Sequence, residues 1–222
     1  MRPELDRAAR TAVDRAIEAF RAGDPVLIHD ADDREGETDV VYPADAVEPM
    51  DVARLRNDAG GLVCVALSDY VAGAFELPFL SGAIDHPAAG DHDVAYDERS
   101  SFSLPVNHRD TYTGITDRDR ALTIRKLSVA AADPGAIDFA TEFRTPGHVH
   151  LLRAAPALLD ERRGHTEFGI ALADAADRAP AVVVCEMLDD LTGEALTPAD
   201  AREYARRHDF PFVEGEWLTD RL

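Results

Sequence analysis

The sequence of 222 residues predicts a single α/β domain, an α+β sandwich in which helices flank a mixed β-sheet. Three observations support this prediction. Segments in which apolar residues recur at helical spacing alternate with short runs of consecutive apolar residues, which are typical of buried strands. One hairpin-like pair of strands interrupts that alternation, which favours a mixed sheet over a purely parallel one. No Gly-, Ser- or Pro-rich linker divides the chain, so residues 1–222 are expected to form one domain.

The first half of the chain is predicted from apolar spacing and from residues that end helices. Apolar side chains at helical spacing between Leu5 and Phe20 predict a helix that Gly23 and Pro25 end. The next elements are predicted to be the two strands of a hairpin, a helix, a buried strand and a short helix. They cover residues 25–29, 40–42, 49–57, 62–67 and 69–76.

The second half contains two clear helix starts. Thr116, followed three residues later by Asp119, resembles an N-cap for a helix over 117–131, and a Thr-Pro pair begins the last long helix at position 198. The other predicted elements are strands over 102–107, 149–152 and 182–187 and a helix over 167–178. Residues 81–101 are too long for an ordinary connection, so we interpret this segment as either functional or mobile.

The charge balance argues against one class of partner. The chain has 43 acidic and 23 basic residues, which give a formal net charge of −20. Phosphate backbones repel such a surface, so no nucleic-acid partner is expected. Lys126 is the only lysine. An acidic, lysine-poor surface leads to the hypothesis of a halophilic protein, and a high-GC coding bias that favours Arg, Ala and Asp is the alternative.

Several common site types and locations have no support in the sequence. No apolar run is long enough to span a bilayer, and charges stand where a signal peptide would be apolar, so a cytoplasmic location without a membrane partner is expected. No Gly-x-Gly-x-x-Gly follows a strand and no P-loop is present. Cys64 and Cys185 both lie in apolar runs, which predicts buried thiols rather than a zinc site or a disulfide framework.

An acidic segment follows the first predicted hairpin strand. Four of the seven residues from Asp33 to Asp39 are acidic, where composition alone gives about 1.4. If this segment is extended, Glu35, Glu37 and Asp39 share one face. Converging carboxylates require a counter-charge, and hard oxygen ligands favour magnesium or manganese over zinc. The alternative is a solvated acidic turn, of which 91–98 is another example.

Three further segments contain candidate site residues. A Pro-Gly turn is predicted to place His148 at the mouth of a strand, where it is either a general acid or base or an ordinary surface histidine. The stretch Arg162–Glu167 combines two arginines and a glycine with a helix start, which suits a phosphate or is simply a capped helix. Its His165 could also ligate a metal. Glu186 ends an apolar run, as either a site residue or half of a salt bridge.

Four motifs in this order resemble those of the 3,4-dihydroxy-2-butanone 4-phosphate synthase family. They are Asp-Arg-Glu-Gly-Glu-Thr-Asp at 33–39, Thr-Pro-Gly-His-Val at 145–149, Arg-Arg-Gly-His-Thr-Glu at 162–167 and Cys-Glu at 185–186. The resemblance extends from about Val26 to Glu216. It implies an α/β sandwich that works as a homodimer with sites near the subunit interface. It also implies conversion of ribulose 5-phosphate to 3,4-dihydroxy-2-butanone 4-phosphate and formate in riboflavin biosynthesis, with Mg²⁺ or Mn²⁺ as the cofactor.

The resemblance also implies a role for each matching residue. Glu35 and His165 would ligate the metal, and His148 and Glu186 match positions essential to catalysis. The residues that would bind the sugar phosphate or line the site are Asp30, Arg34, Glu35, Glu37, Asp39, Cys64, Thr113, Arg162, Arg163, Gly164, His165, Thr166 and Glu186. The reaction should begin by removing a proton next to the ketone, giving an enediol that the metal stabilises. Asp30, Glu37 and Glu186 are rival bases for that step.

Some features depart from the family pattern or leave other functions open. Arg163 replaces a frequent glycine, and the segment 81–101 is longer than in the bacterial form. No second catalytic domain is expected, which favours the stand-alone, archaeal-type enzyme over a fusion with a cyclohydrolase. One rival function is a non-catalytic α/β module that binds RNA, which should have a basic surface. Another is a magnesium-dependent phosphosugar isomerase or phosphatase, which would release no formate.

Overall fold

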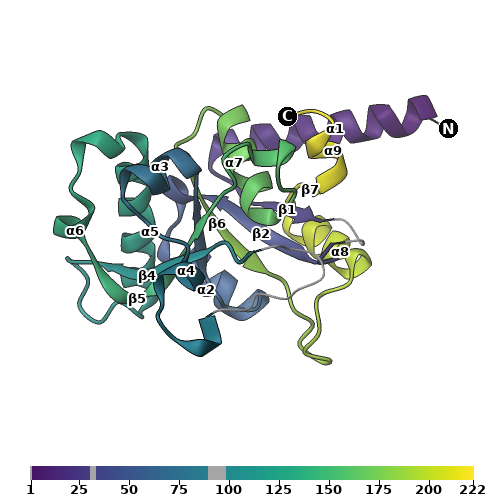
Figure 1. Ribbon diagram of the computed structural model, residues 1–222. Helices are drawn as coiled ribbons and strands as arrows, with labels where there is room; N and C mark the ends of the chain where they lie inside the picture. The colour runs from purple at the N-terminus through teal and green to yellow at the C-terminus, as the bar shows by residue number, and fades with distance from the viewer. Residues whose placement is uncertain (1, 31–33, 90–98) are drawn as a thin grey trace.

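A seven-stranded mixed sheet forms the centre of the molecule (Figure 1). The computed structural model describes the backbone of residues 2–30, 34–89 and 99–222, with side chains from residue 7 onward. The strands are β1 (Val26–His29), β2 (Thr38–Pro43), β3 (Cys64–Leu67), β4 (Phe102–His108), β5 (Phe143–Arg153), β6 (Ala181–Glu186) and β7 (Phe212–Glu214). Their order is β4-β5-β3-β6-β2-β1-β7, in which β3 pairs with β5 and β1 with β7 in parallel and the other neighbours are antiparallel. The predicted mixed sheet and the β1–β2 hairpin are confirmed.

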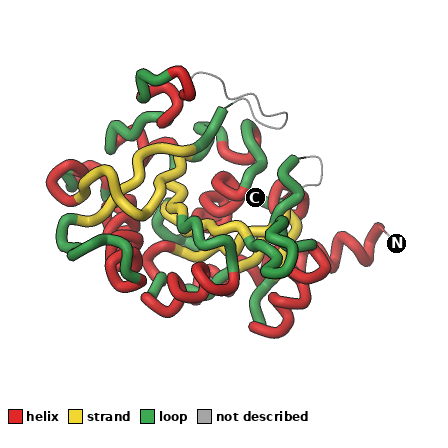
Figure 2. The backbone as a smooth tube through the Cα atoms, turned by 90° about the horizontal axis from the view of Figure 1, so that it is seen from below, coloured by secondary structure: helices red, strands yellow, loops and turns green. Residues whose placement is uncertain are grey.

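Helices cover both faces of this sheet, which makes three layers. They are α1 (Arg2–Ala22), α2 (Pro49–Asp58), α3 (Asp69–Ala74), α4 (Leu80–Ala83), α5 (Asp117–Ala132), α6 (Phe139–Glu142), α7 (His165–Ala175), α8 (Pro198–His208) and α9 (Gly215–Thr219). One core cluster joins α1, α7 and α9 to the sheet, and the other joins α2, α5 and α8 to its opposite face. Figure 2 shows the N-terminal end of α1 extending away from the body.

Alternation along the strands assigns side chains to the two cores. In β1, Val26 and Ile28 pack beneath α1 and α7, whereas Leu27 packs on the other side, and all three are fully buried. The continuous apolar runs in the sequence are therefore strands with two buried faces, as predicted. Among the described residues, none of the helices combines the length and the apolar character that a membrane span requires.

Side-chain caps fix two helix starts that the sequence predicts. The Thr116 hydroxyl accepts a hydrogen bond from the Asp119 N–H at 3.1 Å, and the Thr197 hydroxyl accepts one from the Asp200 N–H at 3.2 Å. Each cap satisfies an N–H group that the first helical turn leaves without a partner.

Three local predictions are wrong. Pro146 and Gly147 do not form a turn before a strand but lie within β5, where residues 145–148 bulge because they have no partners in β4. The helix predicted from 167 begins at His165, since Gly164 takes the extended N-cap conformation. Leu62 precedes β3 and is 52% exposed instead of belonging to a buried strand.

Candidate active site

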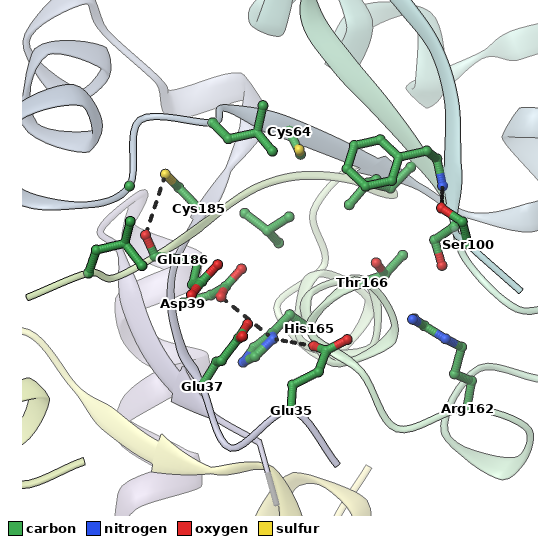
Figure 3. A pocket seen from close by; sticks show the side chains of 17 residues that line it. Glu35, Glu37, Asp39, Cys64, Ser100, Arg162, His165, Thr166, Cys185 and Glu186 are labelled. Carbon is green, nitrogen blue, oxygen red and sulfur yellow. Dashed lines mark hydrogen bonds and ion pairs between the residues drawn. The ribbon is translucent and has the colours of Figure 1, made fainter. Parts of the chain in front are cut away.

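A cavity of about 340 Å³ opens at the ends of three central strands, where β2 and β3 begin and β6 ends (Figure 3). His165 and Thr166, at the start of α7, form part of its wall. Glu35, Glu37, Asp39, Cys64, Arg162, His165, Thr166 and Glu186 line it, and all of these are residues that the sequence singles out. Figure 3 shows the carboxylates and His165 on one side of the cavity, and Arg162, Thr166 and Ser100 on the other. The cavity therefore has an acidic side and a side suited to an anion.

The buried carboxylate of Asp30 organises the acidic loop between β1 and β2. It accepts hydrogen bonds from the N–H of Glu37 at 2.9 Å and from the N–H of Glu35 at 3.4 Å, and Arg34 Nη1 lies 3.5 Å from it. These bonds wrap the loop around Asp30, so Glu35 and Glu37 point into the cavity although the loop is a turn rather than an extended strand at Glu35. Asp33, the first residue of the acidic motif, lies outside the described residues.

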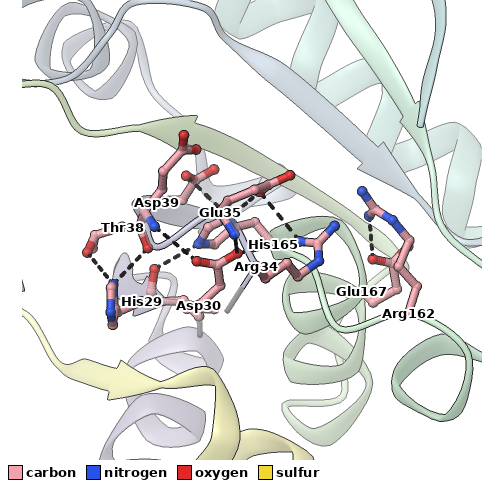
Figure 4. A network of polar contacts seen from close by, with 11 residues as sticks. His29, Asp30, Arg34, Glu35, Thr38, Asp39, Arg162, His165 and Glu167 are labelled. Carbon is pink, nitrogen blue, oxygen red and sulfur yellow. Dashed lines mark hydrogen bonds and ion pairs between the residues drawn. The ribbon is translucent and has the colours of Figure 1, made fainter. Parts of the chain in front are cut away.

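His165 is held by its helix position and by one backbone bond (Figure 4). Its Nε2 lies 3.1 Å from the Ile28 carbonyl oxygen, which can only accept, so Nε2 has the proton. Nδ1 then faces the acidic loop, at 3.6 Å from Asp39 Oδ1 and 3.7 Å from Glu35 Oε2. A ring nitrogen whose partner nitrogen donates to a carbonyl is the usual arrangement of a metal-binding histidine.

The residues at this point fit a divalent cation. One ligand atom each from Asp30, Glu35 and His165 lie within 4.8 Å of one another. Carboxylate oxygens with one imidazole suit magnesium or manganese. The carboxylates of Asp30, Glu35 and Asp39 converge on His165, and their mutual repulsion favours a cation between them. In the register of β2 and β6, Asp39 lies directly opposite Glu186, which adds a further pair of like charges.

These neighbours shift the ionisation of the cluster in opposite directions. Burial and the charges of Glu186, Glu35 and Asp39 raise the pKa of Glu37 to about 7. Burial also raises the pKa of Asp39 to about 6, although His165 opposes the shift. For His165 itself, burial disfavours the charged ring, but Asp39, Glu35 and Asp30 outweigh it and raise the pKa to about 9.

Two other carboxylates complete this pattern. Burial acts to raise the pKa of Glu35, but the hydrogen bond with His165 and the charge of Arg34 outweigh it and lower the pKa. Burial, with a contribution from Glu35, raises the pKa of Glu186. Near neutral pH the cluster therefore holds both charged and protonated groups, as acid–base chemistry requires.

The opposite side of the cavity is built around Gly164. A Cβ at this position would lie 2.5 Å from Arg34 Nη1 and 2.8 Å from Arg162 Nη1, so glycine lets both guanidinium groups lie against the start of α7, and a larger residue would displace them. Arg162 is oriented by Glu167, whose fully buried carboxylate lies 2.7 Å from its Nη1 and also accepts the Ala155 N–H at 2.9 Å. Two arginines at an uncapped helix N-terminus suit a phosphate.

Six residues in the site prediction do not line the cavity of this chain: His148, Thr113, Arg163, Asp30, Arg34 and Gly164. His148 is exposed on the bulge of β5, and Thr113 is exposed in the turn before α5, where its N–H and hydroxyl both donate to Asp119. Arg163 is also exposed, and its Nε donates to the Leu159 carbonyl at 3.4 Å. Asp30 lies beneath the acidic loop and does not line the cavity itself.

Part of the cavity wall consists of residues that are absent from the site prediction. These residues are Gly60, Leu62, Ser100, Ser101, Phe102, Leu152, Val184, Cys185 and Leu188. Cys185 could have been included because it directly precedes Glu186. The others become neighbours only through the order of the strands, which a single sequence does not specify.

Replacing Cys64 by serine is expected to leave measurable activity, within about tenfold of wild type. Burial is the main cause that raises the pKa of this thiol, which therefore stays protonated and is a poor nucleophile at neutral pH. Burial likewise raises the pKa of Cys185 to about 12. The measurement is the steady-state rate of substrate turnover by the Cys64→Ser variant. Cys64→Ala is a second variant, which adds no hydroxyl. A folded Cys64→Ala protein without activity would contradict the prediction.

A family model for 3,4-dihydroxy-2-butanone 4-phosphate synthase matches residues 14–220. The chain belongs to this family. The resemblance drawn from the four motifs is therefore confirmed, and the match covers all of the cavity residues.

Named members of the 3,4-dihydroxy-2-butanone 4-phosphate synthase family are similar over nearly the whole chain. The enzyme of Methanosarcina mazei is 48% identical over 221 residues, covering 94% of this chain and 90% of its own. That of Archaeoglobus fulgidus is 48% identical over 219 residues, with 93% and 92% covered.

Solved structures of family members have the same architecture. The synthase of Candida albicans superposes with a TM-score of 0.77 at 31% identity, covering 94% of this chain and 95% of its own. A synthase in complex with two magnesium ions superposes with a TM-score of 0.74 at 30% identity, with 91% and 92% covered. The predicted single-domain α/β fold is confirmed by these neighbours.

Proposed function

We propose that this protein is a lyase that converts ribulose 5-phosphate to 3,4-dihydroxy-2-butanone 4-phosphate and formate, in riboflavin biosynthesis. The observation that supports this most strongly is the division of one cavity into two chemically different sides. Arg162, Thr166 and the start of α7 line the side that suits a phosphate, with Arg34 next to Gly164, and the cluster of carboxylates around His165 suits the polyhydroxy ketone at the other end of the same molecule.

Glu35 and His165 would hold a divalent cation, Mg²⁺ or Mn²⁺, with Asp30 within reach. When bound, such a cation would polarise the oxygens of a ketose and acidify the neighbouring C–H. The protein's own part is to orient the donors: the Ile28 carbonyl fixes the His165 ring, and Asp30 holds the backbone of Glu35.

Glu37 and Glu186 are the best candidates for moving protons. Both line the cavity, and the pKa of Glu37 near 7 lets it accept and return a proton near neutral pH. Asp30 is a weaker candidate for the first base because its oxygens already accept two backbone N–H groups beneath the loop. We therefore assign the first proton removal to the pair Glu37 and Glu186.

A homodimer would supply what the cavity of one chain lacks. His148 and Thr113 match family site positions but are exposed away from the cavity. Beside Thr113, Tyr112 is 93% exposed and Ile115 is 51% exposed, and large apolar side chains that protrude in this way are typical of a contact surface. We infer that a second copy covers this surface and that His148 of one subunit completes the cavity of the other.

The decisive test is to incubate the protein with ribulose 5-phosphate and magnesium and to follow formate. We expect formate and a phosphorylated four-carbon product in equal amounts. EDTA should stop the reaction, and Mg²⁺ or Mn²⁺ should restore it. An isomerised pentose phosphate or free phosphate as the sole product would refute the proposal and favour one of the rival enzymes.

Binding of the cation is expected to release a proton and to strengthen as the pH rises. In the metal-free protein the pKa of His165 is about 9, so its Nδ1 is protonated at neutral pH and must lose that proton to become a ligand. Affinity should rise about tenfold per pH unit between pH 7 and pH 9 and then level off. Calorimetry with Mn²⁺ in buffers of different ionisation enthalpy measures both effects. An affinity that does not change over this range would contradict the role of His165.

We also infer that the acidic surface is an adaptation to a salty cytoplasm. Repulsion at a net charge of −20 is screened by salt, so the melting temperature should rise by about 5 °C or more from dilute buffer to molar KCl. Thermal denaturation at increasing KCl measures this. No stabilisation by molar salt would leave coding bias as the explanation for the single lysine.

A further inference from the structure

Two side-chain hydrogen bonds fasten the bulge that holds His148 to β4: Thr145 Oγ1 donates to the Pro105 carbonyl at 2.8 Å, and the buried Asn107 makes the other. The β4–β5 register passes from Val106↔Val149 directly to Asn107↔Arg144, so residues 145–148 have no partners in the ladder. Asn107, which is 3% exposed, bonds to this stretch instead: its Oδ1 accepts the His148 N–H at 2.9 Å. The backbone position of His148 therefore depends on the Asn107 amide.

Two glycines let the amide occupy this place. A Cβ at Gly114 would overlap the Asn107 side chain, and Gly114 has a φ of +87°, which a larger residue adopts only with strain. A Cβ at Gly147 would overlap the backbone of Val106 and Asn107, so the bulge can lie directly on β4 only with glycine there. The amide is thus confined between the turn before α5 and the bulge of β5.

The orientation of the amide determines what it offers to the imidazole. Because Oδ1 accepts the backbone N–H of His148, Nδ2 is the group that faces the ring, at 3.2 Å from Nδ1. An amide nitrogen can only donate, so Nδ1 must present its lone pair. Oδ1 is also 3.3 Å from Nδ1, but a proton on Nδ1 would set its N–H against the amide Nδ2–H at 3.2 Å, and this repulsion disfavours that tautomer. Nδ1 as acceptor leaves the proton of the neutral ring on Nε2.

We propose that Asn107 is a positioning residue that fixes His148 as the Nε2–H tautomer, so that the exposed nitrogen is a hydrogen-bond donor. This inference rests on the proposed function, in which His148 enters the cavity of the partner subunit. There a neutral Nε2–H would donate to a ketose oxygen and stabilise negative charge on it, while the carboxylates act as bases. The opposite tautomer would present a lone pair and act as one more base.

Replacing Asn107 by aspartate tests the proposal with little change of shape. A carboxylate can still accept the backbone N–H of His148 but cannot donate to the ring. The proton of the neutral ring should therefore move from Nε2 to Nδ1. We expect kcat to fall about 10²-fold, as for other lost oxyanion donors, with KM within about threefold of wild type. Asn57→Asp adds the same charge at an exposed site and should behave as wild type. An Asn107→Asp variant that keeps the wild-type kcat would overturn the proposal.

A spectroscopic measurement separates this proposal from the proposed function. Long-range ¹H–¹⁵N correlation spectra of the ¹⁵N-labelled wild-type protein above neutral pH, assigned with His148→Gln, report which ring nitrogen has the proton. We expect Nε2 in wild type and Nδ1 in Asn107→Asp. A proton on Nδ1 in wild type would overturn the proposal even if Asn107→Asp does not fold. Absence of formate release by wild type would instead refute the proposed function.

Discussion

A Glu35→Gln variant is expected to lose more than about 10²-fold in kcat while remaining folded. The carboxylate lies 3.7 Å from His165 Nδ1 at the point where ligand atoms converge, and an amide oxygen is a weaker ligand for a hard cation. Folding should be preserved because the substitution keeps the shape and because the Asp30 carboxylate, not Glu35, holds the backbone of the acidic loop. Turnover, Mn²⁺ affinity by calorimetry and thermal denaturation measure the three expectations.

His165→Ala should be equally inactive but less stable. It removes the imidazole donor from the Ile28 carbonyl, a loss of about 1 kcal/mol for one hydrogen bond, and removes the positive charge among three carboxylates. Glu18→Gln, on the exposed side of α1, is the matched control for Glu35→Gln and should be indistinguishable from wild type. Full activity of Glu35→Gln at saturating magnesium would rule out Glu35 as a ligand.

Mixing two inactive variants is expected to restore activity if His148 acts in the cavity of the partner subunit. Glu35→Gln and His148→Ala homodimers should each be inactive. In a heterodimer, one cavity would receive both defects and the other neither. Random reassembly of equal amounts should therefore recover roughly a quarter of the wild-type activity. The measurement is formate release after the two proteins are mixed, partly unfolded and refolded together.

The same mixture has an internal control. Glu35→Gln mixed with His165→Ala should stay inactive under any pairing, because both residues belong to the same cavity of one chain. If Glu35→Gln with His148→Ala also remains inactive while heterodimers are present by mass spectrometry, then His148 does not complete the cavity of a second copy.

Local chemistry made most of the fold predictable. Caps such as Thr116 and continuous apolar runs such as the one in β6 specify a helix start and a buried strand without reference to the rest of the chain. The short β7 and α9 were missed, since three to five residues give too little periodicity. The Pro146-Gly147 turn was predicted wrongly because a bulge and a turn require the same residues, and only the partner strand distinguishes them.

Part of the candidate site could be predicted from the order of the motifs, not from local helix and strand signals. Motif order indicates that Glu35 and His165 act together although 130 positions separate them in the sequence, and the structure places them 3.7 Å apart. Spacing cannot indicate that Asp30 serves as the backbone acceptor of a loop, because that depends on how the loop closes. Nor can it indicate whether His148 acts in the cavity of a second copy, since one sequence describes one chain.

The register between β2 and β6 determines both the packing of the core and the position of the site residues. Asp39 and Glu186 are opposite each other in β2 and β6, and Val40, the residue beside Asp39, is buried in the core on the other face. A slip of one residue would bring apolar side chains to the cavity and acids to the core. Misaligned chains would therefore be unstable as well as inactive. Selection for a stable sheet therefore also preserves the alignment of the site residues. A long-lived but inactive misfolded population is not expected.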